Sequence, residues 1–122
     1  MSEVDSEIEM AEEALADIKV MREASIRRRY STLYYSLYHA ARASLISREY
    51  APKTHEGLDS LVHNILQREQ GILTEDEASL FSKIKTRKEQ ADYEKGFLGS
   101  EEEFEELKGK AESLISQLKE SV

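Results

Sequence analysis

Four of the six tyrosines in this chain fall between Tyr30 and Tyr38, and His39 follows directly. Tyr34 and Tyr38 are four residues apart, so a helix places both rings on one face, toward a core. A phenol needs a hydrogen-bond partner when it is buried. The pattern therefore predicts either a networked core or a helix that lines a polar pocket.

Arg87 interrupts the apolar stripe of a later helix, between Ile84 and Ala91. A guanidinium keeps its charge, so a buried one needs a carboxylate, a phosphate or several carbonyls. One interpretation is an arginine at the rim that covers the core with its stem and reaches water. The other is a guanidinium held in a groove to bind phosphate. Three nearby lysines support the second interpretation: Lys83, Lys85 and Lys88.

The three histidines, His39, His55 and His63, form no i, i+4 pair and no HExxH motif, so we expect no metal site. His39 fits a hydrogen-bonded residue at the core edge better than a base. His55 comes just before a helix start, where a capping role is the simplest, and we expect His63 at the surface. The chain has no GxSxG motif and no Gly-rich phosphate loop, which argues against a hydrolase with a nucleophilic triad. We expect no cofactor.

The composition sets the class of protein. A length of 122 residues predicts one domain, residues 1–122, and the absence of cysteine excludes disulfides and thiolate metal sites. The net charge of -8 argues against general coating of DNA or RNA. We find no apolar stretch near 20 residues and no apolar signal-peptide core at the start, so we expect a cytoplasmic protein without membrane contact.

The secondary structure that positions these candidate residues is helical. Periodic apolar stripes predict five helices, with boundaries near residues 22–25, at Pro52, at Gly71 and in a loop at residues 96–99. Thr74 with Glu77, and Ser100 with Glu103, each match a capping box at a helix start. Short connections predict an all-α, five-helix, antiparallel up-and-down bundle.

We expect six apolar and aromatic side chains to be buried together because they lie on the inward stripes of their helices: Tyr34, Leu37, Tyr38, Ile65, Ile84 and Leu114.

Three segments carry a resemblance to a known family. They read Tyr34-Tyr-Ser-Leu-Tyr-His-Ala-Ala-Arg42, Lys53-Thr-His-Glu-Gly57 and Arg87-Lys-Glu-Gln-Ala-Asp-Tyr93. In this order they resemble the HEPN superfamily, over residues 11–94, and most of all an uncharacterised branch with "YYAxFHAA", "KxHxG" and "RxxADY" motifs. Genes of this superfamily often neighbour a minimal nucleotidyltransferase.

The resemblance implies a helical bundle that forms a homodimer with a polar groove. It also implies a nucleotide or an RNA as ligand and a nucleotidyltransferase as partner in a two-gene, toxin–antitoxin-like module. The motifs supply these candidate binding residues: Arg87, Asp92, Tyr93, Tyr35, His39, His55 and Lys53.

Many members of the superfamily are metal-independent ribonucleases with an Arg-x4-6-His motif. Here Arg87 matches the arginine, but Asp92 stands where the histidine is expected, and no histidine follows. An aspartate at neutral pH has no proton to donate, so it cannot act as the general acid. The branch also carries an arginine just before its tyrosine pair, where this chain reads Ser31-Thr-Leu33.

Three hypotheses follow. The first is a binding protein without strong catalysis that partners a nucleotidyltransferase. The second is an active ribonuclease toxin that uses Arg87 with His39 or His55 across a dimer groove. The third is a structural dimerisation module.

Overall fold

The computed structural model describes residues 2–21, 24–93 and 99–122. The helices are α1 (Glu3–Val20), α2 (Ile26–Ile46), α3 (His55–Leu61), the π-helix η1 (Val62–Glu69), α4 (Glu75–Tyr93) and α5 (Glu101–Glu120). Because η1 continues α3 directly, the two form the third helix, and the prediction of an all-α, five-helix bundle is confirmed. No strand occurs in the described ranges.

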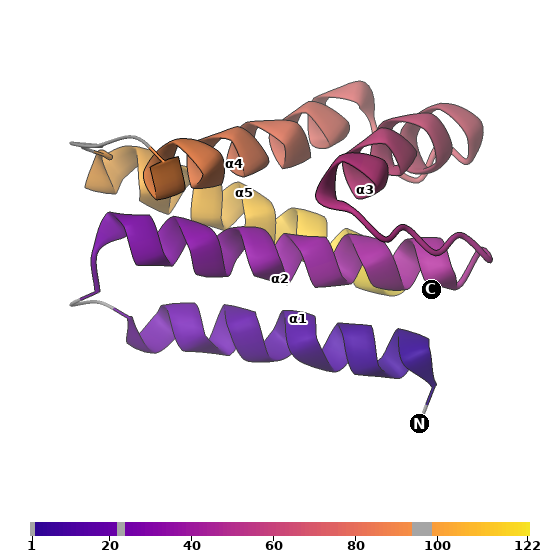
Figure 1. The fold of residues 1–122 in the computed structure, drawn as a ribbon, viewed down its shortest axis with the longest axis horizontal. Helices are drawn as coiled ribbons and strands as arrows, with labels where there is room; N and C mark the ends of the chain where they lie inside the picture. Colours follow the sequence, from indigo (N-terminus) through magenta and orange to yellow (C-terminus); the bar gives the residue numbers. More distant parts are fainter. Residues whose placement is uncertain (1, 22–23, 94–98) are drawn as a thin grey trace.

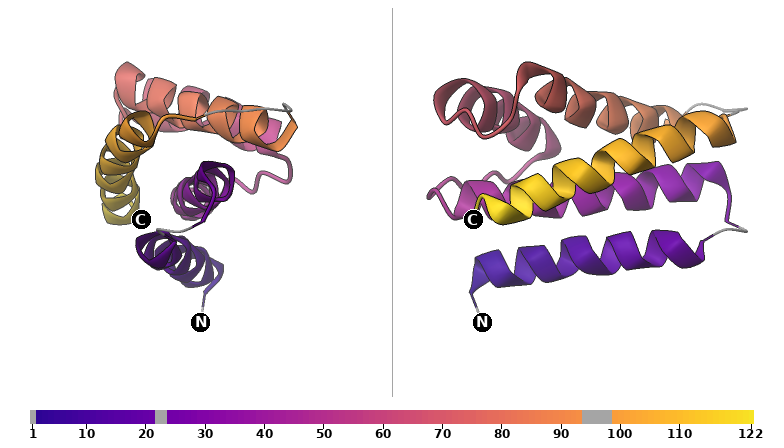
Figure 2. Two further views of the ribbon diagram at one scale, coloured as in Figure 1. Left: turned by 90° about the vertical axis from the view of Figure 1, so that its left-hand side faces the viewer. Right: turned by 180° about the vertical axis from the view of Figure 1, so that it is seen from behind.

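Helix α2 lies at the centre of the bundle and packs against α1, α4 and α5 (Figure 1). Seen from the end, α1 lies on one side of α2, and α4 and α5 cover the other sides (Figure 2). Long helices that follow one another in the chain run antiparallel, whereas α2 and α5 run parallel (Figure 1). The α3–η1 helix lies across one end, next to the C-terminal half of α2 and the start of α4.

The central position of α2 follows from its sequence, which is buried on more than one face. Leu33 and Leu37 belong to the apolar core, and Ala40, Ala41 and Ala43 are also fully buried. Small side chains let neighbouring helices approach closely. Ser36 is buried as well, and its hydroxyl donates to the carbonyl of Ala11 on α1 at 2.8 Å.

The predicted core is present, with one difference. Tyr34, Leu37, Ile65, Ile84 and Leu114 are buried in one cluster. Tyr38 only packs against the cluster and stays partly exposed, because its ring lies at the edge beside His39 and His55.

Helix boundaries follow the predicted signals. The chain is not helical at Met21, Ala24 and Ser25, and Ser25 caps α2 by accepting the Arg28 amide hydrogen at 3.2 Å. The rest of the predicted break, residues 22 and 23, lies outside the described residues. So does most of the predicted loop at 96–99, of which Gly99 is described and not helical.

The two predicted capping boxes differ in structure. Thr74 and Glu77 form a complete box, in which each side chain accepts the other's amide hydrogen, at 3.1 and 2.9 Å. Ser100 accepts the amide hydrogen of Glu103 at 3.2 Å. The carboxylate of Glu103, however, turns away toward Arg87 on α4.

The cap of the third helix corrects the role expected for His55. Thr54 is the N-cap, and its hydroxyl accepts the Gly57 amide hydrogen at 2.9 Å. A Cβ at Gly57 would come within 2.9 Å of the same oxygen, so glycine permits this close turn. His55 is the first helical residue, and its ring is free to enter the tyrosine cluster.

None of the helices in the described part of the chain is long and apolar enough to cross a membrane. Within the same residues, no group of three or more His, Asp or Glu side chains could hold a metal ion.

Candidate functional site

A pocket of about 270 Å³ opens where α4 meets α2 and the start of α3. Its lining residues combine aromatic rings with charges of both signs: Tyr34, His55, Glu56, Lys85, Lys88, Glu89 and Tyr93. We call this the tyrosine–histidine pocket. Helix α2 contributes the tyrosine motif, α3 the histidine, and α4 the two lysines, so three distant sequence motifs meet here.

His55 is the centre of the aromatic cluster. Its Nδ1 atom lies 2.9 Å from the hydroxyl of Tyr34, and its ring centroid lies 4.9 Å from that of Tyr38 and 6.3 Å from that of Tyr35. Tyr34 is buried, and burial raises the pKa of its phenol. The phenol therefore stays protonated at neutral pH and can hydrogen-bond the imidazole as a neutral group.

Lys88 brings positive charge to the aromatic rings. Its Nζ atom lies 5.6 Å from the ring centroid of Tyr35 and 5.9 Å from that of Tyr34, within the range of cation–π attraction. Burial lowers the pKa of Lys88, but the hydrogen bond and the charge of Asp92 more than offset this, and the pKa is raised. The ammonium is therefore charged at neutral pH.

Both lysines of the pocket are paired along α4. Lys88 Nζ lies 2.6 Å from Asp92 Oδ2, and Lys85 Nζ lies 3.8 Å from Glu89 Oε1, each pair being four residues apart. The lysine side chains are only 14% and 16% exposed, while Glu89 is 50% and Asp92 27% exposed, so each pair has one end near solvent.

Two exposed rings border the pocket. Tyr93 is 81% exposed and Tyr35 is 39% exposed, although both are large and apolar for the most part. An exposed aromatic face beside a lysine is the arrangement on which nucleic acid bases stack. Of the predicted candidates, His55 and Tyr93 line the pocket, and Tyr35 lies next to it, against His55 and Lys88. Asp92 reaches the pocket through its pair with Lys88.

Arg87 lies outside the pocket and faces α5. Its Nε and Nη2 atoms lie 3.0 and 3.1 Å from the two carboxylate oxygens of Glu103, and Nη1 donates to Gln90 at 3.0 Å. Tyr30 donates to the same carboxylate at 3.3 Å. The guanidinium thus holds α4 to α5, and of the partners that the sequence left open, a carboxylate from another helix of the same chain is the one present.

His39 also lies apart from the pocket, between α2 and α1. Its Nδ1 atom lies 2.6 Å from Glu7 Oε2, and the other oxygen of Glu7 accepts from Arg42. Glu7 is buried. The structure therefore places His39 in a network at the core edge. Lys53 is exposed in the segment before α3 and does not line the pocket.

His63, which the sequence places at the surface, is 29% exposed and has partners on neighbouring helices. It lies in η1, partly buried, and its Nε2 atom lies 2.7 Å from the hydroxyl of Ser82 on α4. Ser82 donates to Asp59 on α3 at 2.9 Å. The three side chains tie the third helix to α4. These contacts join different helices, so the periodicity within a single helix could not predict them.

Sequence reasoning used Lys85 and Lys88 only to support phosphate binding by Arg87 and did not name them as binding residues themselves. The available signal was spacing: they are three residues apart, hence on one face of a helix. The sequence reasoning also did not predict the polar contacts that Glu7, Arg29 and Glu101 form between helices. Arg29 is buried and bonded to Glu101 at 2.8 Å, and the hydrogen bond from Arg29 lowers the pKa of that carboxyl.

The family model described as "HEPN domain" matches residues 4–121. A UPF0332 protein of Archaeoglobus fulgidus is 34% identical over 94 residues, 76% of this chain and 74% of that protein. A protein of Methanocaldococcus jannaschii whose name reads "Putative toxin" is 28% identical over 121 residues, 98% of this chain and 89% of that protein.

Proposed function

This chain belongs to the HEPN family, and from that membership we propose that it binds a nucleotide or a short single-stranded RNA in the tyrosine–histidine pocket. Under this proposal it is the toxin-like half of a two-gene module, it forms a homodimer, and it partners a nucleotidyltransferase without strong catalysis of its own. The name of the Methanocaldococcus relative supports the toxin-like class, and the resemblance of the motifs supports the partner.

The observation that carries the proposal is the position of Lys88 beside the rings of Tyr34 and Tyr35. A nucleotide needs an aromatic face for its base and a cation for its phosphate. The exposed rings of Tyr93, in the pocket, and Tyr35, beside it, offer the first, and Lys88 offers the second. Stacking of one base on an aromatic side chain contributes about 1 to 3 kcal/mol. Because the rest of the chain is acidic, we expect the phosphate to be held locally rather than along an extended strand.

Weak or absent catalysis is consistent with the engagement of the motif residues. Arg87, which matches the family arginine, uses its guanidinium on Glu103, and Asp92 stands at the histidine position with its carboxylate on Lys88. Binding is therefore the role that this geometry supports best.

A titration of fluorescein-labelled single-stranded RNA, followed by anisotropy, tests the proposal. Tyr35→Ala should weaken binding at least about fivefold, the equivalent of about 1 kcal/mol of lost stacking. Lys88→Ala should weaken it as well. Lys110→Ala is the matched control, since Lys110 also forms an i, i+4 ion pair, with Glu106 at 3.1 Å, but lies outside the pocket.

Salt provides a second reading of the same experiment. Two phosphate contacts to a single strand, from Lys85 and Lys88, give a logarithmic salt slope of about −1.4, so a fourfold rise in salt should weaken binding about sevenfold. Binding that is insensitive to salt and to both pocket variants would refute the proposal.

The partner and the dimer are tested separately. Light scattering of the purified chain gives its oligomeric state. Mixing it with the product of the adjacent gene shows whether the two proteins co-elute. A monomer that does not co-elute with the product of the adjacent gene would contradict the dimer and the two-gene module. It would not affect the proposed binding of a nucleotide or RNA in the pocket.

A ribonuclease is the second candidate because His55 lies inside the same pocket, fixed by Tyr34 at 2.9 Å. An imidazole next to a bound phosphodiester can act as acid or base. Incubation of a labelled RNA with wild type and His55→Asn distinguishes the two candidates. Cleavage that His55→Asn abolishes would establish the ribonuclease, whereas intact RNA with retained binding supports the binding protein.

A further inference from the structure

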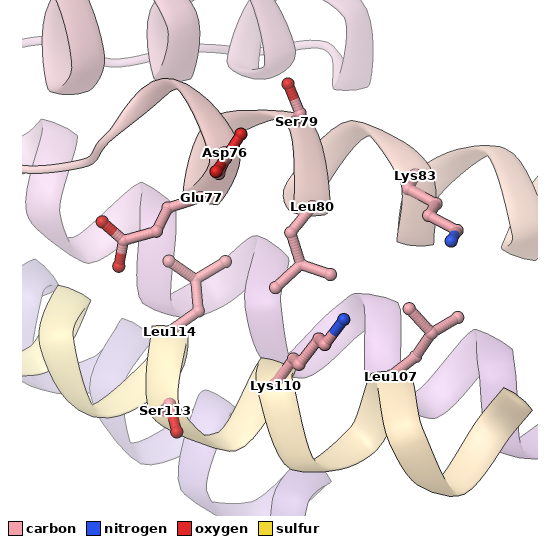
Figure 3. A pocket seen from close by; sticks show the side chains of 9 residues that line it. All are labelled: Asp76, Glu77, Ser79, Leu80, Lys83, Leu107, Lys110, Ser113 and Leu114. Carbon is pink, nitrogen blue, oxygen red and sulfur yellow. The ribbon is translucent and has the colours of Figure 1, made fainter.

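A second hollow lies on the other side of α4, between α4 and α5, and shares no lining residue with the tyrosine–histidine pocket. Its volume is about 550 Å³. We call it the α4–α5 groove. Leu80 of α4 and Leu107 and Leu114 of α5 point toward one another across it (Figure 3). Leu107 and Leu114 are buried and form the floor, whereas Leu80 is only half-buried.

The two ends of the groove carry opposite charge (Figure 3). Asp76 and Glu77 lie at one end, and Lys83 and Lys110 lie toward the other. The lysines come from different helices. Lys110 pairs with Glu106, while Lys83 forms no ion pair with any residue that the structure describes. One carboxylate placed between the two ammonium groups would gain both attractions.

The dimensions fit a helix. Leu107 and Leu114 are seven residues apart, which is two turns or about 10 Å along α5. A helix with apolar residues at i, i+4 and i+7 presents a stripe of the same length, and a groove between two antiparallel helices accepts such a stripe. The opposite charges at the ends then select a helix with an acidic end and a basic end, and fix its direction.

We propose that the α4–α5 groove binds an amphipathic helix of a partner protein, whose apolar stripe covers Leu80 and whose carboxylates lie between Lys83 and Lys110. The occupant is defined by this chemistry: three apolar residues over two turns, acidic residues one turn before the stripe and basic residues one turn after it. The groove is thus a protein-docking surface, separate from the nucleotide pocket, and a chain with both can hold a ligand and a partner together.

The probe is a blocked synthetic helix of about 16 residues with leucines at i, i+4 and i+7, glutamates in its first turn and lysines in its last. Glutamates in the first turn also favour the helix itself. A second peptide with glutamine in place of the glutamates keeps the leucines and removes the carboxylates. Binding is followed by NMR of labelled leucine methyl groups in the full chain.

The expected result is saturable movement of the methyl signals of Leu80, Leu107 and Leu114, with the glutamate peptide binding at least about fivefold more tightly than the glutamine peptide. The double variant Lys83→Glu/Lys110→Glu should abolish that preference. Lys108→Glu, whose lysine belongs to α5 but lines a different pocket, should keep it. All three lysines reach solvent, so the melting temperatures of the variants should match wild type.

Two results would overturn the proposal. Equal affinity for both peptides, or methyl shifts away from the groove, would show that the charged ends select nothing. Leu80 signals that change with protein concentration in the absence of peptide would show that a second copy covers the groove instead.

Discussion

The Nδ1 atom of His39 on α2 lies 2.6 Å from Oε2 of Glu7 on α1, and Arg42 one turn further along α2 takes the other oxygen. Glu7 is buried, and its side chain is only 10% exposed. Since α1 packs mainly against α2, this carboxylate is one polar link of the first helix to the bundle, beside the hydrogen bond from Ser36 to the Ala11 carbonyl.

Removing the carboxylate should destabilise the protein. Glu7→Ala removes the partner of the His39 imidazole and leaves Arg42 with only its longer contacts to Glu3 and the Pro52 carbonyl, both at 3.4 Å. We expect a loss of about 2 to 4 kcal/mol in the free energy of unfolding. Urea denaturation measures it. Glu9→Ala, at an exposed position of the same helix, is the control and should change stability by less than about 0.5 kcal/mol. Equal effects would show that the network does not hold α1.

Shortening a buried side chain at the centre of α2 should lower the free energy of unfolding by a similar amount, for a different reason. Leu37 is fully buried, so Leu37→Ala leaves a cavity and should lower the free energy of unfolding by about 2 to 5 kcal/mol. Thermal and denaturant melts check this value. A variant that melts with wild type would show that the site collapses without loss of packing.

Two buried tyrosines should make the protein sensitive to alkaline pH. Burial, followed by the nearby charge and hydrogen bond of Glu103, raises the pKa of Tyr30 from 10.0 to about 12, and burial raises that of Tyr34 as well. The unfolded phenols ionise first, so the stabilisation is complete below pH 10 and is lost as pH rises toward 12. The free energy of unfolding should therefore decrease between pH 10 and pH 12, and it should decrease less steeply for Tyr30→Phe than for wild type.

Substitution of Arg87 distinguishes its two interpretations, a structural arginine and a phosphate-binding one. Arg87→Ala breaks the two-point contact with Glu103, whose side chain is 36% exposed, so the cost should be modest, about 1 kcal/mol. For a domain of this size the melting temperature should fall by about 3 to 5 °C. RNA binding by the folded fraction should stay within about twofold of wild type. A folded Arg87→Ala variant that has lost RNA binding as fully as Lys88→Ala would establish the phosphate-binding interpretation.

The sequence by itself determined the elements. Apolar periodicity predicted five helices, and Pro52, Gly71, Thr74 and Ser100 marked boundaries that the structure confirms. These signals are local: a cap, a left-handed glycine at φ 63° or a proline acts within a few residues of itself. The same locality explains why the family could be identified from three short motifs in order.

Tertiary structure decided the partners. Sequence spacing showed that a buried Arg87 would need a carboxylate, a phosphate or several carbonyls, but it could not show that Glu103, sixteen residues away on another helix, is the partner. The same holds for Glu7 and His39, which are 32 residues apart, and for His55 and Tyr34, 21 residues apart. A helix repeats its own faces every few residues, but which face meets which neighbour depends on how the helices pack. Only that packing brings the rings of α2, the imidazole of α3 and the lysines of α4 into one pocket.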